Sequence, residues 1–519
     1  MSRHVDRREF LRILATVGAG AAVGYNKPKP QYLHANFEPP EDRAPGSFVL
    51  YATTCRECPA GCGVWARTLE GRAVKLEGNP PEHPLSHGAL CARGQAAVQS
   101  LYNPDRLTKP LARGDDGQLH EVSWDEAFRR LNQSVTQLLA DGRGKPVAWL
   151  IGEISDSDAD LLELLSRETD MRGPVNLRLL AKTPLACAAQ NLFGYQGVPE
   201  LQLEAADLIV ALEADFAESW GNPVAQIHGF TRAHAYRDGR LARAVFVGPR
   251  QSTTASICDE WIPLAPGREA AALRVMIEGM LHGPAARTAT GRMAPPAEIA
   301  AAGALLAAIP LAEAEQALGS SSATLRKLGE ELTAAKAPLV FTSGLGPDAE
   351  PAHSLALLAM HLLGQTGRTV RFPSPGRPPR GSAIEEVRNL LNDVESGAVE
   401  ALLVQEANPA FLLPGAAETL QKARFIACFT MQFDETAALA HLVLPIHHSL
   451  ENWGDHAAAD QTRRRAARLV LPSRLLLRRP RRRQALSGCG SNASSSSSLR
   501  WLTTISPIRG ATTGPRGWS

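Results

Sequence analysis

Four cysteines near the N-terminus constrain this 519-residue chain more than any other feature. They are spaced C-x2-C-x3-C-x28-C, at Cys55, Cys58, Cys62 and Cys91. Thiolates are soft ligands that suit iron, and three of them so close together surround one side of a cluster while the fourth closes it from a distance. A pair of disulfides is the alternative, but structural disulfides need no such tight trio. The pattern therefore predicts a metal cluster.

The N-terminus carries the pattern of an export signal. Arg7-Arg8 precede a short, apolar, glycine-bearing stretch at 13–23, a combination typical of a twin-arginine leader. We expect residues 1–30 to be this signal, residues 31–46 to be a Pro-rich linker, and the protein to work on the periplasmic side of the bacterial inner membrane. No clear cleavage motif follows, so removal of the leader and its retention as an anchor both stay open. No other stretch reaches the ~18 apolar residues of a membrane helix.

Charge is distributed unevenly along the chain. The net charge is +2, but residues 461–519 contain 13 arginines and no lysine, aspartate or glutamate, so the first 460 residues carry a net −11. Because no aromatic residues are interleaved with the arginines of 463–483, we expect no nucleic-acid partner. Residues 456–519 are expected to be an irregular tail, either disordered or translated from a shifted reading frame that begins near Asp455.

The middle of the chain alternates short apolar runs with helix-length segments. Runs of four or five residues are candidate buried strands: Val147–Ile151, Leu208–Leu212, Ala244–Val247, Leu339–Thr342, Ala401–Val404 and Phe425–Phe429. This alternation of short apolar runs and helix-length segments indicates parallel sheets covered by helices. We expect an α/β protein with a small β-rich iron–sulfur domain at 47–105, followed by two nucleotide-fold-like parallel-sheet domains at 106–330 and 331–455.

The two expected sheet domains echo each other weakly. Residues 207–264 run strand, helix, strand and then a short strand ending at a proline, and residues 401–445 repeat this order. The echo favours two related α/β halves.

Several motifs resemble those of the molybdopterin oxidoreductase superfamily, the bis-pterin molybdenum and tungsten enzymes. The segments that carry this resemblance, in the family order, are 54–63, 90–94, 102–111, 123–127, Pro249-Arg250, Thr253-Thr254-Ala255, Pro266-Gly267, Asn408-Pro409 and Leu450-Glu451 with Gly454. The cysteine motif and segment 214–220 look most like the large iron–sulfur subunit of alternative complex III and its polysulfide-reductase-like relatives. That subunit usually carries a further ferredoxin-like domain after the molybdopterin-type domain. This sequence shows none, which agrees with the expectation of a truncated chain.

The resemblance implies two cofactors. The four cysteines would hold a [4Fe–4S] cluster, and a molybdenum bis-pterin guanine dinucleotide would lie beyond it. Arg93, Arg250 and Asn408 match cofactor-binding positions of the family. Arg93, two residues after Cys91, would also offset the negative charge of a thiolate-bound cluster.

Several residues depart from the family pattern at the pterin site. Glu213 and Asp215 replace a Gly-x-Asn turn, and Glu406 stands where a glycine is expected. Negative charge facing a pyrophosphate is unfavourable. The position of a molybdenum ligand falls near Ala181-Lys182, where nothing can ligate, and Cys187 is either a nearby ligand or a plain core thiol. We therefore expect the molybdopterin-type fold without catalytic molybdenum, and no catalytic residue.

These observations favour an exported electron-transfer subunit of a membrane respiratory oxidoreductase. Its partners would be membrane-integral subunits together with cytochrome or iron–sulfur subunits. Two alternatives remain open: an active molybdenum enzyme resembling polysulfide reductase, and a non-functional truncated gene product.

Overall fold

A computed structural model gives the architecture around the cysteines. It describes residues 46, 48–80, 83, 85–140, 144–178, 183–236, 241–284, 302–344, 348–373, 381–382, 384–452, 454–457 and 463–466. The expected leader and linker lie outside these residues, apart from Gly46, and so does the tail beyond residue 466. No helix in the described part of the chain is long and apolar enough to cross a membrane.

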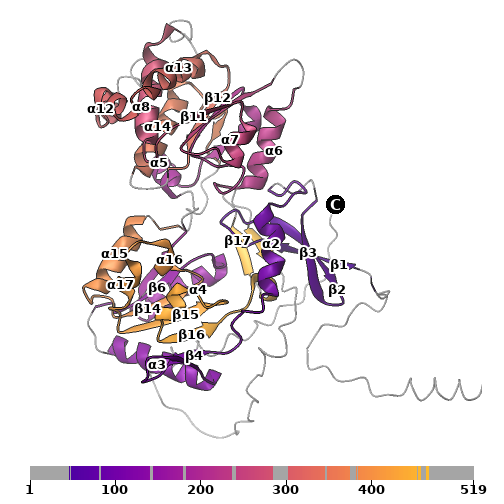
Figure 1. Ribbon diagram of the computed structural model, residues 1–519, viewed down its shortest axis with the longest axis vertical. Coiled ribbons are helices and arrows are strands. Elements are labelled where there is room, and N and C mark those ends of the chain that lie inside the picture. Colours follow the sequence, from indigo (N-terminus) through magenta and orange to yellow (C-terminus); the bar gives the residue numbers. More distant parts are fainter. Residues whose placement is uncertain are drawn as a thin grey trace, which may run out of the picture. The chain divides into compact units, whose positions relative to one another are not determined.

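The cysteine region forms a three-stranded antiparallel sheet, as expected. Its strands are β1 (Phe48–Thr54), β2 (Gly63–Leu69) and β3 (Arg72–Gly78), in the order β1-β2-β3. Helix α2 (Ala92–Leu101) packs against β3 (Figure 1). Inward-facing residues of β2 and β3 share an apolar cluster with α2, and Cys55 and Cys62 belong to it.

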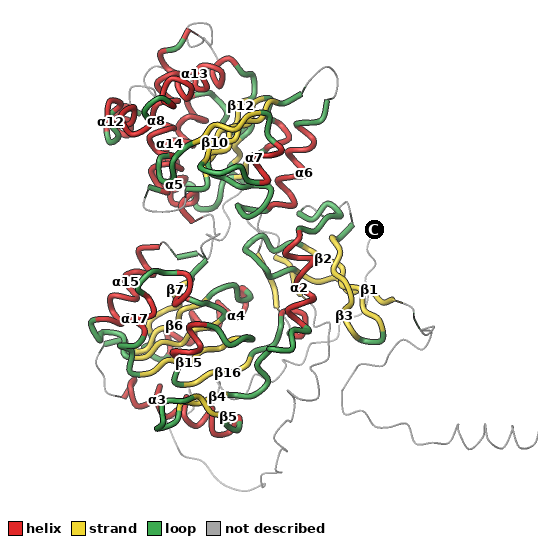
Figure 2. Tube along the Cα trace, in the orientation of Figure 1, coloured by secondary structure: helices red, strands yellow, loops and turns green. Residues whose placement is uncertain are grey.

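A seven-stranded sheet forms the next layer, in the order β5-β4-β16-β15-β14-β6-β7. The five strands from β16 to β7 in this order are parallel, and β4 and β5 add an antiparallel edge. Figure 2 draws the strands of this sheet in yellow. The strands are β4 (Leu111–Arg113), β5 (Leu119–Glu121), β6 (Val147–Ile151), β7 (Arg172–Asn176), β14 (Ala401–Gln405), β15 (Phe425–Thr430) and β16 (Leu442–Pro445). Alternate side chains of β6 and β14 enter two separate cores, so helices cover both faces.

The helices of this sheet divide between its two faces. On one face lie α3 (Trp124–Ala140) and α4 (Asp156–Glu168), and on the other lie α15 (Ile384–Glu395) and α17 (Ala416–Leu420). The short helices α16 (Pro409–Leu412) and α18 (Glu435–Leu439) follow β14 and β15. Residues 449–451 form one 3-10 turn, and the hairpin of β17 (Gly454–Ala457) and β18 (Arg463–Ala466) follows.

The second sheet is four-stranded and wholly parallel, in the order β11-β10-β9-β12. Its strands are β9 (Leu208–Leu212), β10 (Arg243–Gly248), β11 (Glu260–Pro263) and β12 (Pro338–Thr342). The helices of this part, all but α11 labelled in Figure 1, are α5 (Thr183–Phe193), α6 (Pro223–Ala233), α7 (Thr253–Ile257), α8 (Glu269–His282), α11 (Gly303–Ala307), α12 (Leu311–Leu318), α13 (Ser321–Ala334) and α14 (Ala349–Leu362). A 3-10 turn at 203–205 and the two-stranded pair β8 (Glu200–Leu201) and β13 (Val370–Arg371) complete this part.

The α/β class, the six buried strands and the echo between β9–β11 and β14–β16 are confirmed. The division of strands between the two sheets is not as expected. Strands β6 and β7, from the expected domain 106–330, pair in the sheet of β14–β16, and β12 joins β9–β11. The chain leaves the first sheet after β7, builds the second and then returns. The hairpin of β17 and β18 also extends past residue 455, where an irregular tail was expected to begin.

Candidate metal centre and neighbouring cleft

The four cysteines lie on two neighbouring elements of the N-terminal domain. Cys55 follows β1 and Cys62 precedes β2, and the Cys55 N–H donates to the Cys62 carbonyl at 2.8 Å, which closes the loop between the strands. Cys91 is the N-cap residue of α2. None of the four is in a disulfide; the first three are buried and Cys91 is partly exposed.

The chemistry of this donor set fits an iron–sulfur cluster. Burial raises the pKa of Cys55 and of Cys58, so these thiols would stay neutral at physiological pH unless a bound cation compensated the thiolate charge. Four soft ligands in an apolar, water-poor pocket are the usual ligation of a [4Fe–4S] cluster. Among the described residues, no group of three or more potential ligands is placed to share a single metal ion. The four thiols of a cluster bind different irons, so they need not converge on one point.

Two arginines lie beside the cysteine loop. The Arg56 guanidinium donates to the Glu153 carbonyl at 3.1 Å and is 3.9 Å from the Glu406 carboxylate. The Arg93 guanidinium donates to the Glu218 carbonyl at 3.1 Å, which joins α2 to the loop after β9. Burial raises the pKa of Cys58, and the charge of Arg93 opposes that shift. Arg93 is therefore positioned to offset negative charge on a thiolate cluster, whereas Arg56 is engaged by Glu153 and Glu406.

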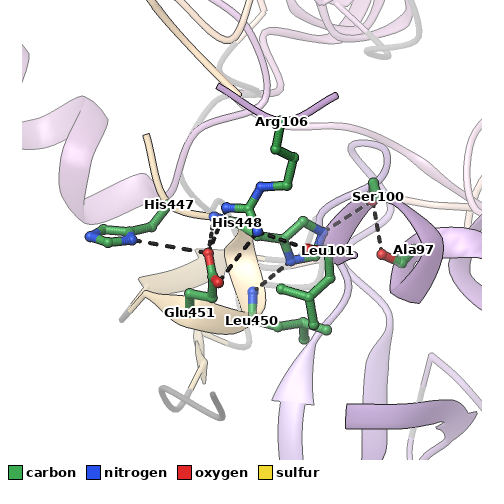
Figure 3. A network of polar contacts seen from close by, with 8 residues as sticks. All are labelled: Ala97, Ser100, Leu101, Arg106, His447, His448, Leu450 and Glu451. Carbon is green, nitrogen blue, oxygen red and sulfur yellow. Dashed lines mark hydrogen bonds and ion pairs between the residues drawn. The ribbon is translucent and has the colours of Figure 1, made fainter. Parts of the chain in front are cut away.

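A buried polar network holds the C-terminal end of α2 in place (Figure 3). Arg106 and Glu451 form a two-pronged ion pair, with N–O distances of 2.7 and 3.3 Å and side chains only 11% and 5% exposed. Burial raises the pKa of Glu451, but hydrogen bonds from Arg106 and the His448 N–H more than offset this, so the pKa lies below its ordinary value. Arg106 also donates to the Leu101 carbonyl at 2.8 Å.

His448 extends the network to Ser100 on α2 (Figure 3). Burial, and then the Arg106 charge, lower the pKa of His448 to about 4, so its ring is neutral near pH 7. The ring Nδ1 accepts from the Leu450 N–H at 3.1 Å, which leaves the Nε2 proton for Ser100 Oγ at 3.2 Å. Ser100 in turn donates to the Ala97 carbonyl at 2.8 Å.

A similar turn, beginning with glutamate, follows one interior strand of each large sheet. Glu213-Ala214-Asp215 follows β9 and Glu406-Ala407-Asn408 follows β14. Glu213 and Glu406 both adopt left-handed backbone, with φ of 51° and 50°. Side-chain-bearing residues rarely adopt this conformation, which costs about 1 kcal/mol or more. Glycine would occupy these positions without strain and would let a ligand approach the backbone closely.

A cavity of about 1480 Å³ adjoins the turn after β9, and its lining includes Glu213, Asp215 and Ser343. Burial, followed by the hydrogen bond and charge of Glu269, raises the pKa of Glu213 to about 8. Within the described residues, the buried atoms Glu213 Oε1 and Asp215 Oδ1 receive no hydrogen bond. A pyrophosphate needs N–H donors, whereas the turn after β9 presents acceptors. This turn therefore does not fit a pyrophosphate, although the cavity lining elsewhere includes Arg178, Arg250, Arg268 and Arg388.

Glu213 is expected to make the protein less stable as the pH rises from about 5 to 8. Its folded-state pKa of about 8 lies above that of an exposed glutamate, so the folded state keeps a proton that the unfolded state has released. This stabilisation is complete below the unfolded pKa and is lost as the pH passes the folded pKa. Glu213→Gln should flatten the pH dependence of the free energy of unfolding, measured by denaturant titration. Parallel profiles for the two proteins would contradict the assignment.

The remaining sequence-predicted positions have local partners. Arg250 is 2.6 Å from Asp215 and 3.6 Å from Glu218, so acidic neighbours already surround it. Asn408 caps α16: its side-chain oxygen accepts from Phe411 N–H and the Thr436 hydroxyl, and its amide donates to Glu435. The cofactor-binding roles of Arg93, Arg250 and Asn408 stay predictions.

Of the two candidate positions for a molybdenum ligand, the structure describes only Cys187. Cys187 lines the cavity, and burial raises the pKa of its thiol. Ala181-Lys182 lie outside the described residues.

Some residues of the site gave no signal in the sequence. Arg106 and Glu451 lie in recognisable segments, but nothing in either segment indicates that they pair across 345 residues. The contact of His448 with Ser100, across 348 residues, gave no signal either. His456, which contacts the cysteine loop, falls where the sequence was expected to lose its folded character.

Two family models match the chain. The model described as "Molybdopterin oxidoreductase Fe4S4 domain" covers residues 49–103, and the model described as "Molybdopterin oxidoreductase" covers residues 106–473. The second match continues past residue 455, so the sequence keeps its family character beyond the expected start of the tail. The change of reading frame near Asp455 stays a prediction.

Among known proteins, the chain is 30% identical over 475 residues to the "Menaquinone reductase, molybdopterin-binding-like subunit" of Nitratidesulfovibrio vulgaris, covering 87% of this chain and 66% of that protein. It is 27% identical over 295 residues to a "Nitrate reductase" of Symbiobacterium thermophilum, covering 54% of this chain and 36% of that protein. The chain thus spans two thirds or less of the length of these relatives. The solved structure of acetylene hydratase from Pelobacter acetylenicus matches in fold, with a TM-score of 0.65, 16% identity, and coverage of 81% of this chain and 66% of that one.

Proposed function

Because the chain belongs to the molybdopterin oxidoreductase family, we propose that it is an electron-transfer subunit of a membrane respiratory complex that works without catalytic molybdenum. One observation carries this proposal: the chain holds a complete set of cluster cysteines, but glutamates occupy the left-handed turns after β9 and β14, and the turn after β9 lines the cavity. The relative from N. vulgaris supports it, since its name describes a molybdopterin-binding-like subunit of a menaquinone reductase.

The residues around the cysteines suit electron transfer. A bound [4Fe–4S] cluster accepts and releases one electron at a time. Cys91 is the N-cap residue of α2, where the partial positive charge of the helix N-terminus offsets the negative charge of a bound cluster. The apolar cluster that contains Cys55 and Cys62 limits access of water, while Arg93 offsets the negative charge.

Metal analysis of the purified full-length chain tests the proposal. We expect about four irons per chain, an electron paramagnetic resonance signal after reduction, and no molybdenum. One molybdenum per chain would overturn the proposal in favour of an active enzyme resembling polysulfide reductase. A folded chain that never carries iron would overturn it in favour of a non-functional product.

Substitution of the acidic turns tests why molybdenum would be absent. Glu213→Gly with Glu406→Gly removes two carboxylates and two strained backbone positions. We expect this double variant to bind guanosine diphosphate at least about 10-fold more tightly than wild type in calorimetric titration, since 1.4 kcal/mol already corresponds to tenfold. Glu70→Gly is the matched control, because Glu70 is also left-handed, at φ of 49°, but lies in the turn between β2 and β3. Unchanged affinity in the double variant would count against the explanation.

The location and the partners follow from the leader and from the relatives. We propose export by the twin-arginine route to the periplasmic side of the inner membrane. There the chain would join membrane-integral quinone-reacting subunits, together with cytochrome or iron–sulfur subunits, as part of a branch resembling alternative complex III. Replacing Arg7-Arg8 by two lysines should leave the chain in the cytoplasmic fraction of the producing bacterium. Normal export of this variant would contradict the route.

A further inference from the structure

The end of the family domain returns to the cysteine loop. The returning segment, defined here as residues 448–452 and 454–456, first contacts α2 through His448. Leu450 packs in the apolar cluster that contains Cys55 and Cys62. Residues almost 400 positions after the cysteines thus form part of their surroundings.

His456 lies directly against the loop between Cys58 and Cys62. A Cβ atom added to Gly61 would fall 1.9 Å from Cδ2 and 2.3 Å from Nε2 of His456, so the imidazole contacts the Gly61 backbone closely. Gly61 also has φ of 58°, so both its conformation and this contact call for glycine. The ring hydrogen-bonds to the Pro59 carbonyl, and His456 is only 8% exposed.

The residues before His456 contact the start of α4. The Asp455 carboxylate accepts from the Ser157 N–H at 2.8 Å, near the start of α4. Gly454 lies close to Ser155, and an added Cβ would be 3.2 Å from that side chain. Because α4 belongs to the seven-stranded sheet, His456 is anchored to a large element and not only to the small cysteine domain.

We propose that His456 is a positioning residue for the cluster: its ring and its N–H fix the backbone of residues 59–61, and with it the two cysteines on either side. The proposal rests on the proposed function, since it assumes that the cysteines hold a cluster. Hydrogen bonding and solvent exposure around a cluster set its reduction potential, and loss of such supporting contacts weakens metal retention. His456 therefore acts on both quantities through the loop.

Two substitutions separate the ring from its hydrogen bond. His456→Ala removes both, and we expect iron to be lost to a chelator about 10-fold faster than from wild type. His456→Phe keeps a flat ring against Gly61 but cannot donate to Pro59. We expect it to retain iron like wild type while its midpoint potential and the resonance spectrum of its reduced cluster change. His120→Ala, at an exposed histidine on β5, is the control and should leave all three quantities unchanged.

Each outcome bears on the proposal. A merely structural role would lower the melting temperature of both variants without changing the potential or spectrum of the iron that remains bound, and this result would overturn it. Wild-type iron loss, potential and spectrum in both variants would also overturn it, while leaving the electron-transfer function intact. A wild-type chain that carries no iron would overturn both proposals together.

Discussion

Cys62→Ala is expected to abolish stable cluster binding, so that iron falls from about four per chain to less than about one. Cys62 is buried and lies directly before β2, at the end of the loop that carries three of the cysteines. Without its thiol, the three remaining cysteines leave one iron without a protein ligand. Because metal binding and folding are coupled, the variant should also unfold at a lower temperature than iron-loaded wild type. Iron and sulfide analysis with resonance spectroscopy of the reduced protein measures the effect.

Cys258→Ala is the matched control for this experiment. Cys258 is a free, partly buried cysteine at the C-cap of α7, on the second sheet and away from the cysteine loop. It should retain the iron content and spectrum of wild type. Equal iron loss in the two variants, or full iron in Cys62→Ala, would contradict the assignment of Cys62 as a ligand.

Arg106→Ala is expected to lower the free energy of unfolding by about 3–5 kcal/mol, because it leaves the buried Glu451 carboxylate without its counter-ion. Three contacts are lost together: two to Glu451 and one to the Leu101 carbonyl. Denaturant titration of the full chain measures the change. The double variant Arg106→Ala with Glu451→Gln should recover part of the loss, since it removes the uncompensated charge.

An exposed ion pair provides the comparison. Arg129 contacts Glu126 one turn away on α3, and its side chain is 59% exposed. Solvent screens such pairs, so Arg129→Ala should leave the denaturation midpoint almost unchanged. If Arg106→Ala had as small an effect as Arg129→Ala, the network in Figure 3 would not stabilise the domain.

The sequence predicted the elements of the fold better than their arrangement. Strands such as β6, β9 and β14 are short apolar runs with no competing helical period, so their existence follows from local pattern. All of them are fully or nearly fully buried runs of similar composition, and nothing local states which strand pairs with which. The placement of β6 beside β14, and not with β9, therefore emerged only in three dimensions.

Local spacing also decided how much of the site could be predicted. Three of the four cysteines lie within one tight loop, and their chemistry follows from composition and distance along the chain. The family resemblance drew attention to Glu213 and Glu406, but their left-handed backbone and the raised pKa values of both carboxyls, about 8 and about 7, depend on packing. His456 reaches the loop only because the seven-stranded sheet is assembled from distant segments.

The split origin of that sheet has a consequence for folding. Strand β6 pairs directly with β14, although the whole four-stranded sheet and its helices lie between them in the sequence. Closing so long a loop is entropically costly while it is disordered, and pairings distant in sequence form slowly. We expect the inserted sheet to fold first and thereby bring β7 and α15 together. The first sheet, and with it the contact of His456 with the cysteine loop, would then be completed only after β14–β17 have left the ribosome.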